Sequence, residues 1–223
     1  MLKNRLKIQR AVNGKSTHYR NKAAKERKRR KIAEKMALID PLTGAFNLRG
    51  FDLRFNEEYA NFMRYKFDVA LIFFDVDNFK SFNSDYGQKT GDEVLKSLVG
   101  TIRTVIRPSD SVHRIGGEEY VALLSKINLL SDGITRVPEK EAVQNAYKVA
   151  ERIRKKIENI EIKPYDGDGV VKVTVSAGVA LLSEAKDRDL LVEYANRAER
   201  KAKDEGKNRT YMFYEGKITE GPE

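Results

Sequence analysis

Two pairs of closely spaced carboxylates are the residues of this chain best suited to chemistry. Asp75 and Asp77 end the apolar stretch "FFDVD", and Glu118 and Glu119 follow two glycines in "RIGGEEY". Side chains alternate along a strand, so Asp75 and Asp77 are expected to share a face. Acids gathered at the mouth of a buried strand repel one another unless a hard cation lies among them, and Mg²⁺ binds carboxylates together with substrate phosphates. The pattern therefore suggests Mg²⁺-dependent phosphate chemistry, with glycines that let a polyphosphate approach the backbone.

A plainer interpretation of the second pair is a polar hairpin. The two glycines would form its turn, and Glu118 and Glu119 would pair with Arg114 or with solvent. Local spacing does not decide between this hairpin and a metal-binding site.

Apolar periodicity predicts the elements that must position these acids. We expect helices at 48–65, 92–106, 139–159 and near 187–204, strands at 67–77, 170–182 and 210–214, and a hairpin over 111–125. A short helix and a glycine-punctuated loop should link 78 to 91. The order implies an α+β domain whose helices pack on a mixed, mostly antiparallel sheet. If strand 67–77 neighbours the hairpin, Asp75 meets one or both glutamates at one end of the sheet.

Composition limits the class of protein. The chain has 223 residues with 40% hydrophobic content, which allows one well-buried domain plus an appendage. No apolar run approaches the roughly 20 residues that a membrane span needs, and we expect neither a span nor a secretory leader. Cysteine is absent, which excludes disulfides and thiolate metal sites and suits a cytoplasmic protein.

The positive charge is concentrated at the N-terminus. Residues 1–40 hold fourteen Lys and Arg against three acids, whereas the whole chain has a net charge of +10, so the remainder is nearly neutral. Residues 19–38 lack Gly and Pro and are predicted to be helical, after a flexible start. This basic helix is either a solvated segment or one with a partner-binding or coiled-coil role. Nucleic acid or anionic lipid would be a suitable anionic partner. We expect a basic tail and helix at 1–39, a domain at 40–215 and a flexible tail at 216–223.

Five motifs in order carry a family resemblance. They are "DPLTGAFNLR", "DVDNFKSFNSDYGQKTGDEVL", "RIGGEEY", "TVSAGVA" and "KAKDEGKNR". From residue 40 onward the chain resembles the GGDEF domain of diguanylate cyclases, in which "RIGGEEY" stands for R-x-G-G-[DE]-E-F. The resemblance implies a palm-like fold related to nucleotidyl cyclases and polymerases. It also implies that two GTP molecules are joined into cyclic di-GMP with release of pyrophosphate, in a homodimer with two Mg²⁺ or Mn²⁺ ions per active site.

The resemblance assigns roles to matching residues. Asp75, the backbone carbonyl of Val76 and Glu118 would hold the metal ions, with Glu119 close by, and Glu118 is also the implied catalytic acid. The implied GTP-binding residues are Asn83 and Asp92 for guanine, and Phe79, Lys80, Gln88, Lys203 and Lys207 around the base and phosphates.

Some positions depart from the family pattern. Gln88 replaces the usual His, Lys207 replaces an Arg and so loses a bidentate fork, and Leu48 replaces an Arg. None of these changes removes an implied metal ligand or guanine contact. We therefore expect an active enzyme with a mildly altered rim.

The stretch "RPSD" has two interpretations. Arg107 and Asp110 match the family's inhibitory site, where cyclic di-GMP would bind away from the active site and inhibit its own synthesis. Arg can grip phosphate or the O6/N7 edge of guanine, and Asp can accept from the guanine N–H groups. The alternative is an ordinary Arg–Asp pair at a helix C-terminus.

Two other functions compete with the cyclase. The first is a degenerate relative that binds GTP or cyclic di-GMP as a receptor without turnover. The second is a nucleic-acid-associated protein with a regulatory palm domain, favoured only by the basic N-terminus. Of the remaining candidates, His113 is expected to be incidental, and "DGDG" at 166–169 is expected to be a hairpin turn because it lacks the bidentate Glu of a calcium loop.

Overall fold

A computed structural model describes residues 25–30, 36–130 and 133–221. Contacts divide the chain into two units, Met1–Ile39 and Asp40–Glu223. In the first unit residues 25–30 are helical, in keeping with the predicted helix over 19–38, most of which lies outside the described residues. No described helix combines the length and the apolar character needed to cross a bilayer.

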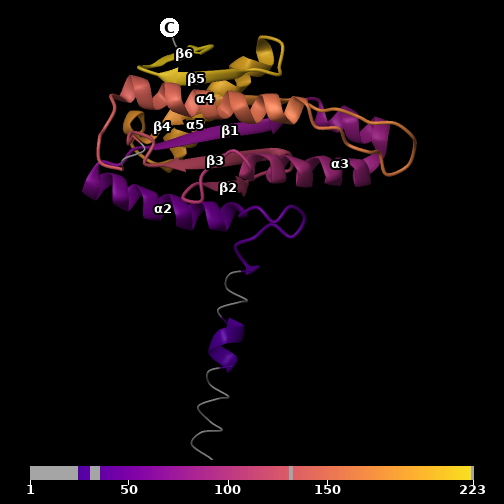
Figure 1. Ribbon diagram of the computed structural model, residues 1–223, viewed down its shortest axis with the longest axis horizontal. Coiled ribbons are helices and arrows are strands. Elements are labelled where there is room, and N and C mark those ends of the chain that lie inside the picture. Colours follow the sequence, from indigo (N-terminus) through magenta and orange to yellow (C-terminus); the bar gives the residue numbers. More distant parts are fainter. Residues whose placement is uncertain (1–24, 31–35, 131–132, 222–223) are drawn as a thin grey trace, which may run out of the picture. The chain divides into compact units, whose positions relative to one another are not determined.

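The second unit is built on one six-stranded sheet (Figure 1). Its strands are β1 (Val69–Val76), β2 (Ser111–Arg114), β3 (Glu119–Ser125), β4 (Val175–Leu181), β5 (Thr210–Tyr214) and β6 (Lys217–Thr219). They lie in the order β2-β3-β1-β4-β5-β6, and only the β4–β5 pair is parallel. The predicted α+β fold with a mixed, mostly antiparallel sheet is confirmed.

Helices cover both faces of the sheet. They are α2 (Leu48–Tyr65), α3 (Phe79–Arg103), α4 (Glu139–Glu158) and α5 (Arg188–Asp204). Along β1, Ile72 and Phe74 pack into the apolar cluster that contains α3 and α4, whereas Leu71 and Phe73 pack into the cluster that contains α2 and α5. Because both faces of β1 are buried, its sequence is a continuous apolar run rather than an alternating one.

Local capping explains where two of these helices begin. The side chain of Asn47 accepts a hydrogen bond from the Gly50 backbone N–H at 3.0 Å at the start of α2. Asp187 accepts from the Leu190 N–H at 3.0 Å at the start of α5. Both satisfy donors that a helix N-terminus leaves free.

The structure differs from the expected elements in the α3 region and in the strand expected at 170–182. The loop expected before residue 92 is instead part of a helical segment that runs through Phe79–Arg103 and breaks at Gly87, whose φ of 79° is not helical. Strand β4 begins at Val175, later than expected. Upstream of it Ile162 and Val171 form an isolated antiparallel bridge around residues 166–169, as the predicted "DGDG" turn requires.

The C-terminal segment corrects the expectation of a flexible tail at 216–223. Residues Lys217–Thr219 form β6, which pairs with β5 in antiparallel register. Glu215 and Gly216 both have positive φ, 50° and 71°, as the tight turn of a two-residue hairpin requires. Ile218 packs against the apolar cluster beside α5. An Asn-Gly or Asp-Gly pair would have predicted this hairpin clearly, whereas the pair Glu-Gly is only weakly typical of a hairpin turn.

Candidate functional site

The ends of β1 and β3 bring the predicted acids together. In the antiparallel pairing Asp75 lies opposite Glu119, and on its other side Asp75 lies opposite Ser176 of β4. Glu118 immediately precedes β3, after the Gly116–Gly117 turn. The expectation that strand 67–77 neighbours the hairpin is therefore correct, and Val76 is the last residue of the same strand.

Asp77 has different surroundings from Asp75. Its carboxylate accepts hydrogen bonds from the Thr174 and Ser176 hydroxyls, both at 2.7 Å, and from the Asn208 N–H at 3.0 Å. The strand ends at Val76, so the alternation that would align Asp77 with Asp75 stops there. Asp77 is buried and joins the end of β1 to β4 and to the loop after α5, and its oxygens are already used.

Lys203 is the nearest cation to the strand-end acids. Its Nζ atom lies 2.9 Å from Asp75 Oδ1 and 3.1 Å from Glu199 Oε1. Burial raises the pKa of Asp75, Lys203 opposes this rise, and the charges of Glu118 and Glu119 add to it. Burial by itself would lower the pKa of Lys203, but the hydrogen bond with Asp75 and the charge of Glu199 raise it overall. Lys203 is thus a firmly protonated cation at the site.

Arg114 supports the glycine turn and does not neutralise the glutamates. Its Nε and Nη2 atoms donate to the Gly117 carbonyl at 2.9 and 2.7 Å, and Nη1 lies 3.2 Å from Asp40 Oδ1. Within the described part of the chain, neither Glu118 nor Glu119 belongs to an ion pair of 4.0 Å or less. The hairpin interpretation in which these glutamates pair with Arg114 is therefore wrong.

Gly116 makes room for a carboxylate. A Cβ atom at this position would lie 2.1 Å from Glu119 Oε2, far closer than nonbonded atoms approach. The Glu119 side chain folds over the first glycine of the turn, so a larger residue there would displace this carboxylate. This local packing fixes the direction of a carboxylate that lies across from Asp75.

A cavity of about 370 Å³ opens between the first part of α3 and the glycine turn. Its lining includes five of the seven predicted GTP-binding residues, namely Phe79, Lys80, Asn83, Gln88 and Asp92. The other lining residues are Leu95, Arg114, Gly117 and Glu118. The structure thus places the proposed guanine-binding residues and the proposed catalytic acid around one cavity.

Asn83, which lines this cavity, has a buried polar atom without a partner. Its Oδ1 atom is buried and has no hydrogen-bond partner among the described residues. A Cβ atom at position 91 would lie 1.9 Å from this oxygen, so Gly91 is required for the position of the amide. A buried acceptor without a partner carries a desolvation cost of about 1–3 kcal/mol, which a bound donor would remove.

The two predicted lysines of the C-terminal motif lie near the end of β1. Lys203 contacts Asp75, and the Lys207 ammonium donates to the side-chain amide oxygen of Asn78, which follows β1 directly. Neither lysine lines the cavity. Leu48, at the first position of α2, is 50% exposed and does not reach the cavity either.

The donor chemistry at the strand ends suits a hard divalent cation. Carboxylates from two neighbouring strands and a backbone carbonyl are the oxygen ligands that Mg²⁺ and Mn²⁺ accept. In the described ranges, however, no three acidic or histidine side chains are close enough to form a ready ligand cluster. Lys203 is the immediate partner of Asp75, so cation binding there requires a change in this ion pair.

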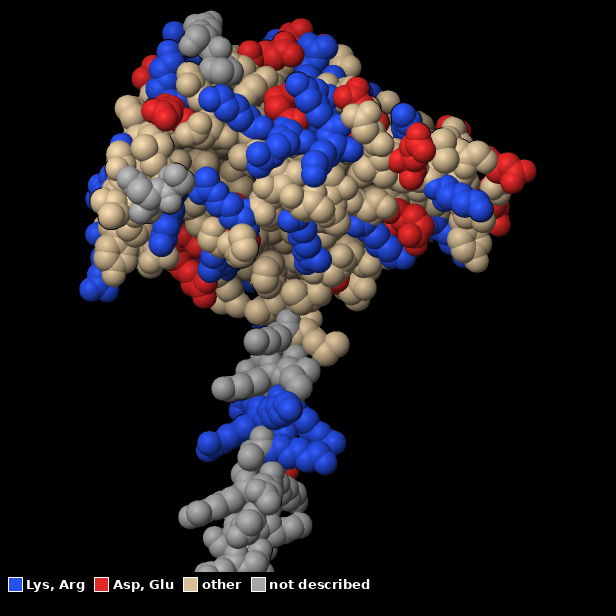
Figure 2. Space-filling model, viewed as in Figure 1, with Lys and Arg blue, Asp and Glu red and all other residues tan. Residues whose placement is uncertain are grey.

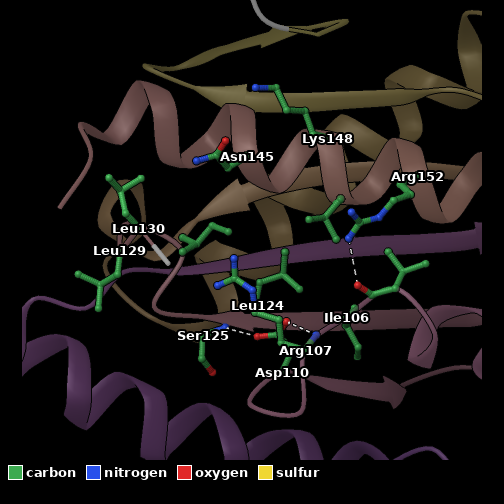
Figure 3. A pocket seen from close by; sticks show the side chains of 13 residues that line it. Ile106, Arg107, Asp110, Leu124, Ser125, Leu129, Leu130, Asn145, Lys148 and Arg152 are labelled. Carbon is green, nitrogen blue, oxygen red and sulfur yellow. Dashed lines mark hydrogen bonds between the residues drawn. The ribbon is translucent and has the colours of Figure 1, made fainter. Parts of the chain in front are cut away.

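Arg107 and Asp110 lie at a second cavity, of about 310 Å³ (Figure 3). The Asp110 carboxylate accepts from the Arg107 backbone N–H at 2.9 Å and from the Ser125 N–H at 3.1 Å. The guanidinium of Arg107 forms no ion pair of 4.0 Å or less with a described residue, although burial raises the pKa of Asp110 and the charge of Arg107 opposes this rise. Lys148 and Arg152 of α4 also line this cavity.

The surface beside the second cavity is basic. Lys148, Arg152, Lys155 and Lys156 are all exposed along α4. Figure 2 shows Lys and Arg side chains gathered on the face of this unit that carries α4. A phosphate-bearing ligand at this cavity would therefore meet little repulsion.

His113 is buried inside the fold, away from these cavities. Its Nε2 atom lies 2.8 Å from the Ser111 hydroxyl, and its ring packs against Phe46 and Phe51. Burial, with a smaller contribution from the charge of Arg54, lowers the pKa of His113 to about 3. The imidazole is neutral and structural, as its isolation in the sequence suggested.

Sequence reasoning missed two features of the site. Asp40 and Arg114 are far apart in the sequence, and only the folded sheet shows that together they support the turn. Glu199 is four residues before Lys203, a spacing that on a helix indicates an ordinary surface ion pair. Its burial, and the approach of Lys203 to Asp75, could not be read from that spacing.

Comparison with known proteins identifies the family. Residues 37–209 match the family described as "Diguanylate cyclase, GGDEF domain". The chain belongs to this family. Family membership explains the order of the five motifs, and it agrees with the palm-like arrangement of acids at the ends of β1 and β3.

Individual relatives agree with this result. The chain is 30% identical over 175 residues to the diguanylate cyclase DosC of Escherichia coli strain K12, covering 78% of the chain and 35% of DosC. This chain spans less than half the length of the curated relatives that it matches, for example 35% of DosC and 47% of the diguanylate cyclase VdcA of Vibrio cholerae. The coiled coil and GGDEF domain of DgcB from Caulobacter crescentus, solved with c-di-GMP, superposes with a TM-score of 0.78 at 21% identity, covering 91% of this chain and 99% of that one.

A further solved structure has the same Gly-Gly-Glu-Glu sequence as this chain. It is the active GGEEF domain of a diguanylate cyclase from Vibrio cholerae, with a TM-score of 0.62 and 27% identity. The match covers 76% of this chain and 97% of that one. The corresponding residues here are Gly116, Gly117, Glu118 and Glu119.

Proposed function

We propose that this chain is an active diguanylate cyclase that condenses two GTP molecules into cyclic di-GMP and two pyrophosphates. The observation that carries the proposal is the shared cavity. Asn83, with its unpartnered buried oxygen, and Glu118, with no ion-pair partner in the described chain, line the same space. An amide oxygen that needs a donor and a carboxylate without a described ion-pair partner, both at one cavity, suit the base and the reacting end of one nucleotide.

Guanine is the base that this cavity suits best. Its N1–H and amino group are donors, and Asp92 and the oxygen of Asn83 are acceptors. Adenine presents no matching pair of donors on that edge and would leave one acceptor unpaired. Gln88 lines the same cavity and can donate to O6 or N7. Phe79 and Lys80, at the start of α3, lie on the side proposed for the phosphates.

We further propose that the strand-end acids hold two Mg²⁺ or Mn²⁺ ions. Asp75, the Val76 carbonyl and Glu118 would be ligands, and Glu119 would support them. When bound, such ions activate a hydroxyl nucleophile and neutralise charge on the reacting phosphates. Lys203 and Lys207 would add positive charge beside the triphosphate. Glu118 both lines the cavity and raises the pKa of Asp75 by repulsion, so it is suited to hold charge next to the attacking 3′-hydroxyl.

The reaction requires two nucleotides that face each other. In each step the 3′-oxygen of one GTP forms a bond to the α-phosphorus of the other, the bond from that phosphorus to pyrophosphate breaks, and the hydroxyl proton passes to water. One domain provides one cavity of this kind, so we propose a two-fold dimer in which two such cavities meet. A cytoplasmic location, where GTP is supplied, belongs to the same proposal.

Product inhibition is part of the proposal. The free guanidinium of Arg107 and the fixed carboxylate of Asp110 border a cavity with a basic rim, which suits the phosphates and guanine edges of cyclic di-GMP. The product would bind there, away from the GTP cavity, and hold the domains in an unproductive arrangement.

The test of the function is to incubate the purified protein with GTP and Mg²⁺ and to identify the products by chromatography and mass spectrometry. We expect cyclic di-GMP from the parent protein and none from Glu118→Gln, which removes a charge at nearly constant volume. Glu161→Gln, an exposed substitution in the loop after α4, is the matched control and should retain the parent rate. GTP binding without any product would instead indicate a receptor, and a Glu118→Gln protein at the parent rate would remove Glu118 from the site.

A further inference from the structure

A second carboxylate shares Lys203 with Asp75. Glu199, on α5, is only 2% exposed, and its Oε1 atom lies 3.1 Å from Lys203 Nζ. Oε1 is buried, and among the described residues its polar contact is this ion pair with Lys203. Lys203 Nζ is also 2.9 Å from Asp75 Oδ1, so the ammonium is held between two carboxylates.

Glu199 occupies a place where the fold favours small apolar side chains. The residues around it on this face of α5 are the buried Ala195, Ala198 and Ala202. The helix backbone approaches β4 so closely that a Cβ atom at Gly178 would lie 2.3 Å from the Glu199 nitrogen. Burial raises the pKa of this carboxyl to about 7, although Lys203 opposes the rise. A carboxylate kept at such a cost is typical of a functional position.

Lys203 is the single ion-pair partner of Glu199 among the described residues. Asp75, in turn, is a proposed metal ligand. Positive charge at Asp75 repels the Lys203 ammonium, which must then move away from it. Glu199 is the carboxylate already in place to receive that ammonium.

We infer that Glu199 is a positioning residue: it is the buried counter-ion that holds Lys203 at the site and allows Lys203 to leave Asp75 when a divalent cation binds there. The inference rests on the proposed function, because it assigns Asp75 to the cation and Lys203 to the triphosphate. It adds Glu199, which lies on a different element from both proposed metal-binding strands, to the residues that set the charge of the site.

The inference predicts two opposite effects of neutralising Glu199. When Glu199 is ionised, Lys203, Asp75 and Glu199 together carry one net negative charge. In Glu199→Gln, Lys203 has only Asp75 as a partner, so it competes more strongly with a divalent cation. The same substitution removes one negative charge near the triphosphate, so the nucleotide is repelled less.

The experiment measures binding without turnover. Mn²⁺ affinity is followed by electron paramagnetic resonance of the free ion, and triphosphate affinity by a fluorescent GTP analogue in the presence of a chelator. For Glu199→Gln we expect Mn²⁺ to bind about tenfold more weakly and the metal-free analogue to bind a few-fold more tightly, the scale of one close charge pair. A residue that only supported the fold would weaken both or neither.

Three variants complete the test. Glu193→Gln removes an exposed glutamate of the same helix, 4.0 Å from Arg197, and should leave both affinities unchanged. Glu199→Asp keeps the charge and should keep metal-free nucleotide binding near the parent value. In a Lys203→Met background, Glu199→Gln should have little effect on Mn²⁺ affinity, because no ammonium at position 203 then competes with the cation for Asp75.

The outcomes separate this inference from the proposed function. Opposite shifts in a protein that forms no cyclic di-GMP would contradict the activity and support the role of Glu199. Product formation together with parent-like affinities in a folded Glu199→Gln protein, or shifts of both affinities in the same direction, would overturn the inference alone. A parent protein that binds neither Mn²⁺ nor the analogue would overturn both.

Discussion

The choice of nucleotide depends on single polar groups in the first cavity. Asp92 and Asn83 are acceptors, and a site built to receive hydrogen bonds discriminates against a base that lacks the donors. We expect Asp92→Ala to raise KM for GTP and to lower kcat/KM about tenfold or more, with a weaker preference for GTP over ATP, because each lost charged hydrogen bond costs about 1.5–3 kcal/mol. Steady-state kinetics with both nucleotides measure this. An unchanged GTP/ATP ratio would remove Asp92 from guanine recognition.

His113 gives the fold a defined dependence on pH. Its pKa in the folded protein is about 3 because of burial, against about 6.5 when unfolded. The unfolded chain therefore binds more protons between these values, and stability is lost as the pH falls below about 6.5. In His113→Phe, which keeps a ring between Phe46 and Phe51, the free energy of unfolding should fall less between pH 7 and pH 5, by about 2 kcal/mol. Denaturant unfolding at both pH values measures it, and equal losses in the two proteins would show that His113 is not buried neutral.

Residues whose role depends on the local motif could be predicted from the sequence. The motifs assign roles to Asp75, Glu118 and Asn83. The structure places Glu118 and Asn83 at one cavity, and it places Asp75 opposite Glu119 in the sheet. Roles that depend on distant segments could not be predicted. The support of the glycine turn by Asp40 requires pairing across the domain, and the burial of Glu199 requires the packing of α5 on β4.

Element packing around β4 depends on a glycine. A Cβ atom at Gly178 would lie 1.9 Å from the Ala195 carbonyl oxygen, and backbone atoms cannot move aside without shifting α5. We expect Gly178→Ala to destabilise the domain by about 3 kcal/mol. Gly100→Ala, on α3 with no atom within 4 Å of the new Cβ, is the control and should stabilise by about 0.5–1 kcal/mol. Thermal unfolding compares the two, and similar melting temperatures would contradict the close α5–β4 contact.

At the level of elements, long apolar segments were predicted well. Helix α2 and strand β5 have the expected bounds, and α4 and α5 end within a residue of them. The exceptions have local causes. The helix α3 continues around Gly87 because one glycine takes the non-helical angles, and β6 depends on a Glu-Gly turn that composition does not mark as a hairpin.

At the scale of the whole molecule, we propose that cyclic di-GMP bound at the second cavity inhibits its own synthesis. Arg107 touches none of the proposed metal ligands, so Arg107→Ala should keep the initial rate and lose inhibition by added cyclic di-GMP. Progress curves at several product concentrations measure the effect, with Arg64→Ala on α2 as an exposed control that should be inhibited like the parent. Equal inhibition of the parent and Arg107→Ala would mean that the product acts at the GTP cavity instead.

The central claim is that this domain joins two separate GTP molecules into one cyclic product, and isotope mixing tests it most directly. The protein is incubated with Mg²⁺ and equal amounts of unlabelled and fully ¹⁵N-labelled GTP, and the products are weighed by mass spectrometry. We expect cyclic di-GMP in three mass forms, with the mixed form twice as abundant as either uniform one, and none from Glu118→Gln. Recovery of both GTP pools unchanged, or of labelled and unlabelled products that contain one guanosine each, would contradict it.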